Sequence, residues 1–377
     1  MSNNVEMHVV NNTNNLNVSN TSNSSHKKDT QIIQNFDKID IKDIKPTTQN
    51  INKNIYEEDL SIMIDELIEL IFNSLNKGNE DNVRKQYIFD YIDNHNIIPQ
   101  ELYNWLLNNQ NNSNSIYLLG YFNYNGIVTN INKQEAIKLY QKAAELENVV
   151  AQLELSAMYI NGKGIEKNYK MAFELSKKLS ESNNPNAINR LGYCYDIGIG
   201  IDINKQKAFE LYQKAADLGN LNGICNLGVC YENGVGTEIN EEKAFELFQK
   251  AADLGNSYGI NNLGFCYEKG IGIDINEQKA FGLYKKAADL GNLYGLCNLG
   301  VCHESGIGTE IDEEKAFILF QKAANLGNHF AQYNLALMYE NGNVIKKDIT
   351  QAIYWYKKSA EQGHMNAKEV LENFIED

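Results

Sequence analysis

The chain has 377 residues, of which 43% are hydrophobic, and carries a formal net charge of −15 at pH 7. An acidic surface repels phosphate backbones and anionic lipid headgroups, so we expect neither nucleic acid nor a membrane as a partner. No apolar run approaches the roughly 18 residues that a membrane-spanning helix requires. The N-terminus lacks the basic start and apolar core of a signal peptide, and we therefore expect a cytoplasmic protein.

The first segment, residues 1–52, is rich in Asn, Ser and Thr and contains few large apolar side chains. Such a composition buries too little apolar surface to offset the entropy lost on ordering. We therefore predict a disordered N-terminal tail.

Residues 53–111 carry helical patterns without a longer period. The first helix has one apolar stripe, formed by Leu60, Ile64, Leu67, Ile68, Ile71 and Leu75. A second stripe uses Val83, Tyr87, Tyr91 and Ile92. A third helix is predicted to begin at Pro99, because proline suits the first helical turn. We interpret this segment as an N-terminal helical cap.

From residue 112 to residue 377 the chain repeats itself with a period of 36 residues. One leucine of each unit recurs at Leu119, Leu155, Leu191, Leu227, Leu263, Leu299 and Leu335. Units that keep one register without insertion indicate a stack of identical supersecondary elements. We predict an all-α fold, an α-solenoid of about seven 36-residue helix–loop–helix repeats closed by a C-terminal capping helix.

Each unit is predicted to contain a helix A, a Gly-x-Gly loop, a helix B and a short turn. An amide or carboxylate at the end of the loop is expected to cap helix B, at Asn132, Asn168, Asn204, Asn240, Asn276, Asp312 and Asp348. A glycine is expected to close helix B, at Gly219, Gly255, Gly291, Gly327 and Gly363. Further glycines inside helix A, such as Gly223 and Gly228, predict close approach between helices.

The loop sequence Gly234-Val235-Gly236 does not fit a phosphate-binding motif. A dinucleotide fingerprint needs a third glycine three residues further on and a preceding strand, whereas this loop has Ile239 and follows a predicted helix. We interpret the glycines as a turn between two helices.

The sequence predicts no cofactor, no metal site and no disulfide. Four cysteines share one repeat position, at Cys194, Cys230, Cys266 and Cys302. Equivalent positions of adjacent repeats lie about 9–10 Å apart, which is beyond the reach of about 7 Å for a disulfide. The six histidines show no ligand spacing, and no nucleophile lies beside a base. We therefore predict a protein that is not an enzyme.

The repeated unit resembles the Sel1-like repeat, a relative of the tetratricopeptide repeat. The residues that carry the resemblance in one unit are Leu191, Gly192, Tyr195, Gly198, Gly200, Lys207, Ala208, Leu211, Tyr212, Lys214, Ala215 and Ala216. The tail, cap and array together also resemble the C-terminal half of fungal proteins that join a kinase-like domain to Sel1-like repeats. No kinase motif itself is present in the chain.

Three rows of side chains recur on helix A outside its packed stripe. The first is an amide row, Asn226, Asn262, Asn298 and Asn334. The second is an aromatic row beside it, Tyr258, Tyr294 and Phe330. The third is an acidic row near the end of helix A, Glu232, Glu268, Glu304 and Glu340 together with Asp196. Each row is consistent either with a solvated face of an acidic, Asn-rich chain or with a protein-binding surface.

The resemblance and the rows together suggest a non-enzymatic scaffold or adaptor that binds a protein or peptide on the concave face of the solenoid. Buried aromatics tend to carry interface energy, so the aromatic row would anchor the partner. The amide row would bind its backbone, and the acidic row would favour a basic partner. Seven units spaced about 9–10 Å apart predict a groove of about 65 Å for an extended peptide. The alternative is a regulatory or targeting arm that works with a protein kinase.

Overall fold

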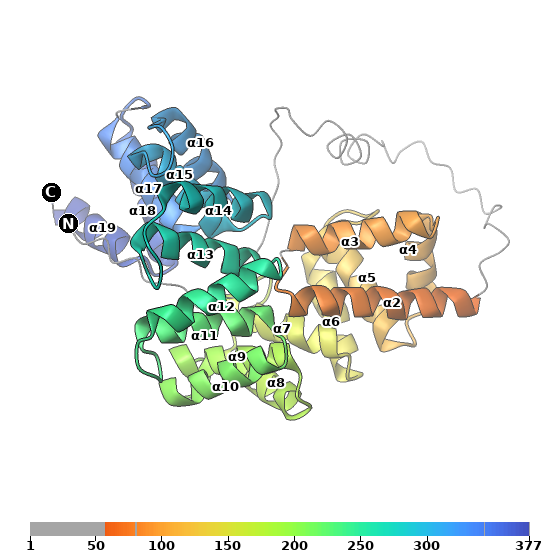
Figure 1. Ribbon diagram of the computed structural model, residues 1–377. Coiled ribbons are helices and arrows are strands. Elements are labelled where there is room, and N and C mark those ends of the chain that lie inside the picture. Colours follow the sequence, from red (N-terminus) through yellow and green to blue (C-terminus); the bar gives the residue numbers. More distant parts are fainter. Residues whose placement is uncertain (1–56, 80, 343, 377) are drawn as a thin grey trace.

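The computed structural model describes residues 57–79, 81–342 and 344–376, and Figure 1 shows their arrangement. This part of the chain forms eighteen helices and contains no strand. The prediction of an all-α solenoid is confirmed. The predicted disordered tail, residues 1–52, lies outside the described residues.

Three helices precede the repeats: α2 (Glu57–Asn76), α3 (Asp81–Asn94) and α4 (Pro99–Asn108). The A helices of the seven repeats are α5 (Ser113–Asn125), α7 (Val149–Asn161), α9 (Pro185–Ile197), α11 (Leu221–Asn233), α13 (Ser257–Lys269), α15 (Leu293–Ser305) and α17 (His329–Asn341). The B helices are α6 (Lys133–Glu145), α8 (Tyr169–Glu181), α10 (Lys205–Asp217), α12 (Glu241–Asp253), α14 (Glu277–Asp289), α16 (Glu313–Asn325) and α18 (Ile349–Glu361). The last helix is α19 (Met365–Glu376).

The B helices begin where the predicted caps stand. All seven predicted Asn and Asp side chains accept a hydrogen bond from the backbone N–H three residues further on, as Asn240 does from Lys243 at 2.9 Å. One such bond contributes about 1 kcal/mol to helix stability. Helix A has caps that the sequence analysis missed, at Asn112, Asn148, Asn184, Asn220, Asn256, Asn292 and Asn328.

The Gly-x-Gly loop is a turn with two different glycine functions. Gly234 ends helix α11 in the left-handed conformation, at φ 70°. Gly236 is also left-handed, at φ 67°, and a Cβ at this position would overlap the carbonyl oxygen of Lys205 in the preceding repeat. The first glycine therefore turns the chain, and the second lets one repeat approach the next.

The glycines of helix A permit close helix packing, as predicted. A Cβ at Gly223 would stand 2.7 Å from the Cβ of Ala215, and one at Gly228 would stand 2.6 Å from the ring of Phe248. Neither contact leaves room for a methyl group. Helix α11 can therefore approach α10 and α12 closely only because Gly223 and Gly228 have no side chain.

Aromatic rings join each repeat to the next. A phenylalanine of helix B meets a tyrosine of the following helix A edge to face in Phe173–Tyr195, Phe209–Tyr231, Phe245–Tyr267 and Phe317–Tyr339. Ring centroids in these pairs lie 5.5 to 6.0 Å apart, the usual range for such contacts. All six cysteines are buried free thiols.

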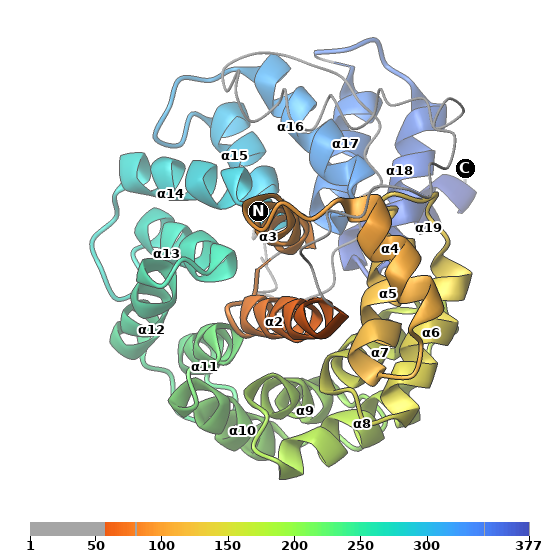
Figure 2. The same ribbon diagram turned by 90° about the vertical axis from the view of Figure 1, so that its right-hand side faces the viewer.

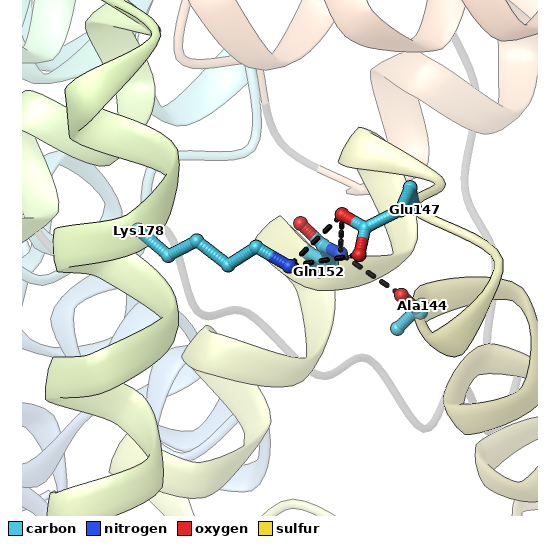
Figure 3. Close-up of polar contacts among 4 residues, drawn as sticks. All are labelled: Ala144, Glu147, Gln152 and Lys178. Carbon is cyan, nitrogen blue, oxygen red and sulfur yellow. Dashed lines mark hydrogen bonds and ion pairs between the residues drawn. The ribbon is translucent and has the colours of Figure 1, made fainter.

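The turn between the first two repeats replaces glycine by glutamate. Glu147 is left-handed at φ 61°, where later repeats place Gly219 or Gly255. Figure 3 shows that its carboxylate accepts hydrogen bonds from Lys178 of α8 at 2.9 Å and from Gln152 of α7 at 3.2 Å. The hydrogen bonds from Lys178 and Gln152 hold the pKa of Glu147 below its usual range. A polar contact between repeats thus accompanies the strained backbone of this turn.

The repeats curve so that the A helices line the inside and the B helices the outside, as Figure 2 shows. We call the side lined by the A helices the concave face. Helix α2 lies inside this curve. No helix in the described part of the chain is long and apolar enough to cross a membrane.

Candidate protein-binding face

The concave face of the first repeats is covered by the chain's own helix α2. Asn114 of α5 donates a hydrogen bond from Nδ2 to Oδ1 of Asp65 at 2.7 Å. Asn186 of α9 donates to Oδ1 of Asn76 at 2.6 Å. The two acceptors are about 16 Å apart along a helix axis, so α2 runs along the array across several A helices. The expected groove of about 65 Å is therefore not open along its whole length.

The end of α2 is held by the middle of the array. Asn256 donates a hydrogen bond from Nδ2 to the backbone oxygen of Lys77 at 3.0 Å. Gly78 follows in the left-handed conformation, and a Cβ there would stand 2.6 Å from Nδ2 of Asn256 and would overlap the amide of Asn222. Helix α2 therefore ends at the fourth and fifth repeats.

Apolar and charged contacts fix the N-terminal helices. The predicted stripe of α2 is confirmed, since Ile64, Leu67, Ile68, Ile71 and Leu75 are buried in one cluster with residues of α5 and α7. The predicted stripe of α3 is partly wrong. Tyr87 is 40% exposed, whereas Arg84, Ile88 and Ile92 are buried. Arg84 turns inward because it pairs with Glu154 of α7 at 3.6 Å and with Asp81.

The side chains of the concave face change type where α2 ends. At the second residue of helix A, the repeats under and beside α2 have Asn114, Val150, Asn186 and Asn222. The three repeats beyond α2 have the aromatic row at the same position, Tyr258, Tyr294 and Phe330. The concave face thus has a first part that seats α2 and a second part lined by rings.

The structure brings the aromatic row together as a line of neighbouring rings. Ring centroids of Tyr258 and Tyr294 lie 6.2 Å apart, and those of Tyr294 and Phe330 lie 6.4 Å apart. His364 extends the line, with its ring 5.2 Å from that of Phe330. Tyr258 is only 5% exposed, whereas Tyr294 and Phe330 are half-buried. Tyr294 and Phe330 therefore present the accessible ring surface of the row.

The amide row forms hydrogen bonds along the array. Asn226 is 1% exposed and donates to Oδ1 of Asn189 at 2.9 Å. Asn298 donates to Oδ1 of Asn261 at 3.0 Å, and Asn262 accepts from Asn261 at 3.3 Å. Asn334 donates to the Sγ of Cys297 at 3.9 Å. Asn226 is enclosed, while the other three amides are half-buried beside the aromatic row.

Most of the acidic row faces helix B of its own repeat. Asp196 accepts from the hydroxyl of Tyr212 at 3.4 Å, Glu268 from that of Tyr284 at 2.7 Å, and Glu340 from that of Tyr356 at 2.6 Å. Asp196 also pairs with Lys205 at 2.7 Å. These three carboxylates therefore link the two helices of one repeat.

Two members of the acidic row differ because the phenol is missing. Helix B has Phe248 and Phe320 where four other repeats have tyrosine, so Glu232 and Glu304 have no phenolic hydroxyl to bind. Glu304 is exposed. Glu232 is 9% exposed and neither carboxylate oxygen has a hydrogen-bond partner. Burial, with a contribution from Glu241, raises the pKa of Glu232 to about 8.

Sequence reasoning missed the asparagines that cap helix A. Their Nδ2 groups also join repeats, since Asn148 donates to Asn114 at 2.6 Å, Asn220 to Asn186 at 2.9 Å and Asn256 to Asn222 at 3.1 Å. The signal was present in the sequence, because an Asn recurs at this position with the same 36-residue period. These amides connect the residues that contact α2.

Comparison with known proteins identifies the repeat. The Sel1 repeat pattern matches residues 113–148, 149–184, 185–220, 222–256, 257–292, 293–328 and 329–364. A search of curated protein sequences finds no match to this chain.

Solved structures that match this chain include other repeat proteins. A protective antigen of uropathogenic Escherichia coli, described as displaying an SLR fold, is 30% identical with a TM-score of 0.44, over 70% of this chain and 57% of that chain. This chain thus spans less than two thirds of the antigen's length. A Sel1 repeat protein from Oxalobacter formigenes is 25% identical with a TM-score of 0.49, over 65% of this chain and 96% of that chain. Because the Sel1 repeat pattern covers seven consecutive units, this chain belongs to the Sel1 repeat family.

Proposed function

We propose that this protein is a non-enzymatic scaffold that binds a partner protein on the concave face of repeats five to seven. Sel1 repeat solenoids generally serve as scaffolds for protein interactions. The main support for the proposal is that helix α2 binds along the concave face of the array. The concave face of the first repeats binds the chain's own α2 segment through Asn114, Asn186 and Asn256. Repeats five to seven have aromatic rings at the second residue of helix A, the position of Asn114 and Asn186.

Within this proposal, Tyr294 and Phe330 are the anchors, and Asn262, Asn298 and Asn334 bind polar groups of the partner beside them. Tyr258 is buried and its ring contacts that of Tyr294, so it helps to position the Tyr294 ring. Asn226 and Glu232 contribute through the packing of the array, since both are buried. The net charge of −15 favours a basic partner at long range. Buried free cysteines suit the reducing cytoplasm in which we place the scaffold.

Affinity capture with the full chain as bait, followed by cross-linking mass spectrometry, tests this function. We expect cross-links from the captured partner to α13, α15 and α17. Cross-links confined to the outer helices α14, α16 and α18 would contradict the proposed face.

A second candidate function is that of a regulatory or targeting arm of a protein kinase. It is supported by the resemblance of the chain to the repeat-containing half of fungal kinase-like proteins. The same capture experiment distinguishes the two functions, because a protein kinase as the main captured partner favours the regulatory arm.

A further inference from the structure

The aromatic row begins where the seat of α2 ends. The carbonyl of Lys77, just after α2, is held by Asn256, and Tyr258 is two residues further along the chain from that amide. The positions that contact α2, Asn114 and Asn186, are equivalent to Tyr294 and Phe330 in later repeats. The second residue of helix A therefore contacts a helix in the first part of the concave face and is an aromatic ring in the second part.

We propose that the aromatic row binds an amphipathic α-helix of the partner protein, laid along the array in the manner of α2. This inference rests on the proposed scaffold function and specifies the segment that the scaffold recognises. Apolar side chains four residues apart on a helix advance by about 6.0 Å along its axis. The accessible rings of Tyr294 and Phe330 are 6.4 Å apart, so two apolar residues at this spacing meet both rings, while the buried ring of Tyr258 lies 6.2 Å from that of Tyr294.

Helix α2 shows which features such a segment needs. Its buried residues Ile64, Ile68, Ile71 and Leu75 are spaced by three or four, which forms one stripe on a helix. Its polar atoms on Asp65 and Asn76 accept hydrogen bonds from amides of the array. The half-buried amides of Asn298 and Asn334 lie one helical turn after Tyr294 and Phe330 and place polar groups beside the rings. A partner helix therefore needs an apolar stripe with polar residues at its edge.

An extended peptide is the competing occupant. Its alternate side chains are about 6.6 Å apart, close to the ring spacing, so spacing alone does not exclude it. The register shared with α2 favours the helix, because the only polypeptide seated on this register in the described part of the chain is helical.

Selection from a phage-displayed library of random 16-residue peptides, with the full chain as bait, tests the inference. We expect the recovered peptides to be enriched in apolar residues spaced by three and four. The strongest peptide, measured by fluorescence anisotropy, should bind at least tenfold more weakly to the variant Tyr294→Asn with Phe330→Asn. Asparagine is chosen because the fold accepts it at this position in Asn114, Asn186 and Asn222.

Tyr354→Asn is the matched control, since Tyr354 lies on α18 outside the row and is 49% exposed. It should leave binding unchanged, and Tyr294→Phe should retain it. Circular dichroism and the melting temperature verify that each variant folds. Enrichment at alternate positions, no enrichment, or equal binding by the double variant would each overturn the helix proposal. A partner captured on another face under those conditions would leave the scaffold function standing, whereas capture of no partner would reject both.

Discussion

Asn186 of the third repeat and Asn76 at the end of α2 are hydrogen-bonded at 2.6 Å although 110 residues separate them in the chain. This contact shows that α2 does more than cover the end of the array. It crosses the concave face, and its last residues reach the repeats where the aromatic row begins. The helix that precedes the repeats thereby occupies the part of the face that comes before the aromatic row.

The first prediction concerns Gly78, which follows the end of α2. Gly78→Ala should destabilise the protein more than Gly255→Ala does, because both glycines are left-handed but only a Cβ at Gly78 meets other atoms. Placing alanine in the left-handed conformation costs each variant about 1 kcal/mol of stability. We expect Gly78→Ala to lose at least as much again, because its Cβ would overlap Asn222 and Asn256. Chemical unfolding measures the difference, and hydrogen exchange should locate it in α2. Equal losses in the two variants would show that the seat tolerates a methyl group.

A second prediction uses two glycines inside helices. Gly282→Ala on α14 should stabilise the protein by about 0.5–1 kcal/mol, because alanine is the better helix former and a Cβ there meets nothing within 4 Å. Gly228→Ala on α11 should destabilise it, because its Cβ would press on the Phe248 ring. Thermal unfolding of the two variants tests the packing of helix A, and a gain in stability from Gly228→Ala would contradict it.

The third prediction concerns the buried carboxyl of Glu232. Its pKa of about 8 in the folded state exceeds the value near 4.5 expected on unfolding. The folded state therefore binds more protons between these values, and its contribution to stability falls as pH rises from about 5 to about 8. Glu232→Gln should remove this decline, so that its stability relative to wild type increases with pH across that window.

Phe248→Tyr tests the same site by supplying the hydroxyl that Glu232 lacks. The new hydroxyl would donate to Glu232 as Tyr284 does to Glu268, and we expect a gain of about 1 kcal/mol at neutral pH. Urea unfolding at pH 5 and pH 8 measures both variants. A wild-type stability that does not fall between these pH values would contradict the raised pKa.

The fourth prediction concerns the rings between repeats. His303 stands where five other repeats have tyrosine and meets Phe281 edge to face, with ring centroids 5.5 Å apart. Burial and the nearby Lys315 lower its pKa, so the folded state binds fewer protons just below the ordinary value near 6.5. Stability should therefore fall as pH drops through that region. His303→Tyr should raise the melting temperature and reduce this dependence, and an unchanged pH profile would contradict the role of His303.

The sequence predicted the repeated architecture because each part of it is local. A capping Asn204 or Asn240, a left-handed Gly234 and an apolar stripe all act within a few residues, and the 36-residue period multiplies the signal. The same reasoning recognised the glycines of the loop as a turn. It also placed the start of α4 at Pro99.

The position of α2 could not be predicted in this way. An apolar stripe shows which side of a helix is buried but not which surface covers it, and the contacts of Asp65 and Asn76 link residues far apart in the chain. The burial of Arg84 depended on Glu154, which belongs to the second repeat. For the same reason the amides of Asn226 and the carboxylate of Glu232 were interpreted as surface groups, although neighbouring helices enclose them.

Hydrogen exchange of the full chain with and without its captured partner tests most directly whether the aromatic part of the concave face is the binding surface. The backbone amides following Tyr258, Tyr294 and Phe330 in α13, α15 and α17 should exchange more slowly in the complex, while α2 remains unchanged. Slower exchange confined to the outer B helices, or faster exchange throughout α2 on binding, would contradict a partner seated beside α2 on that face.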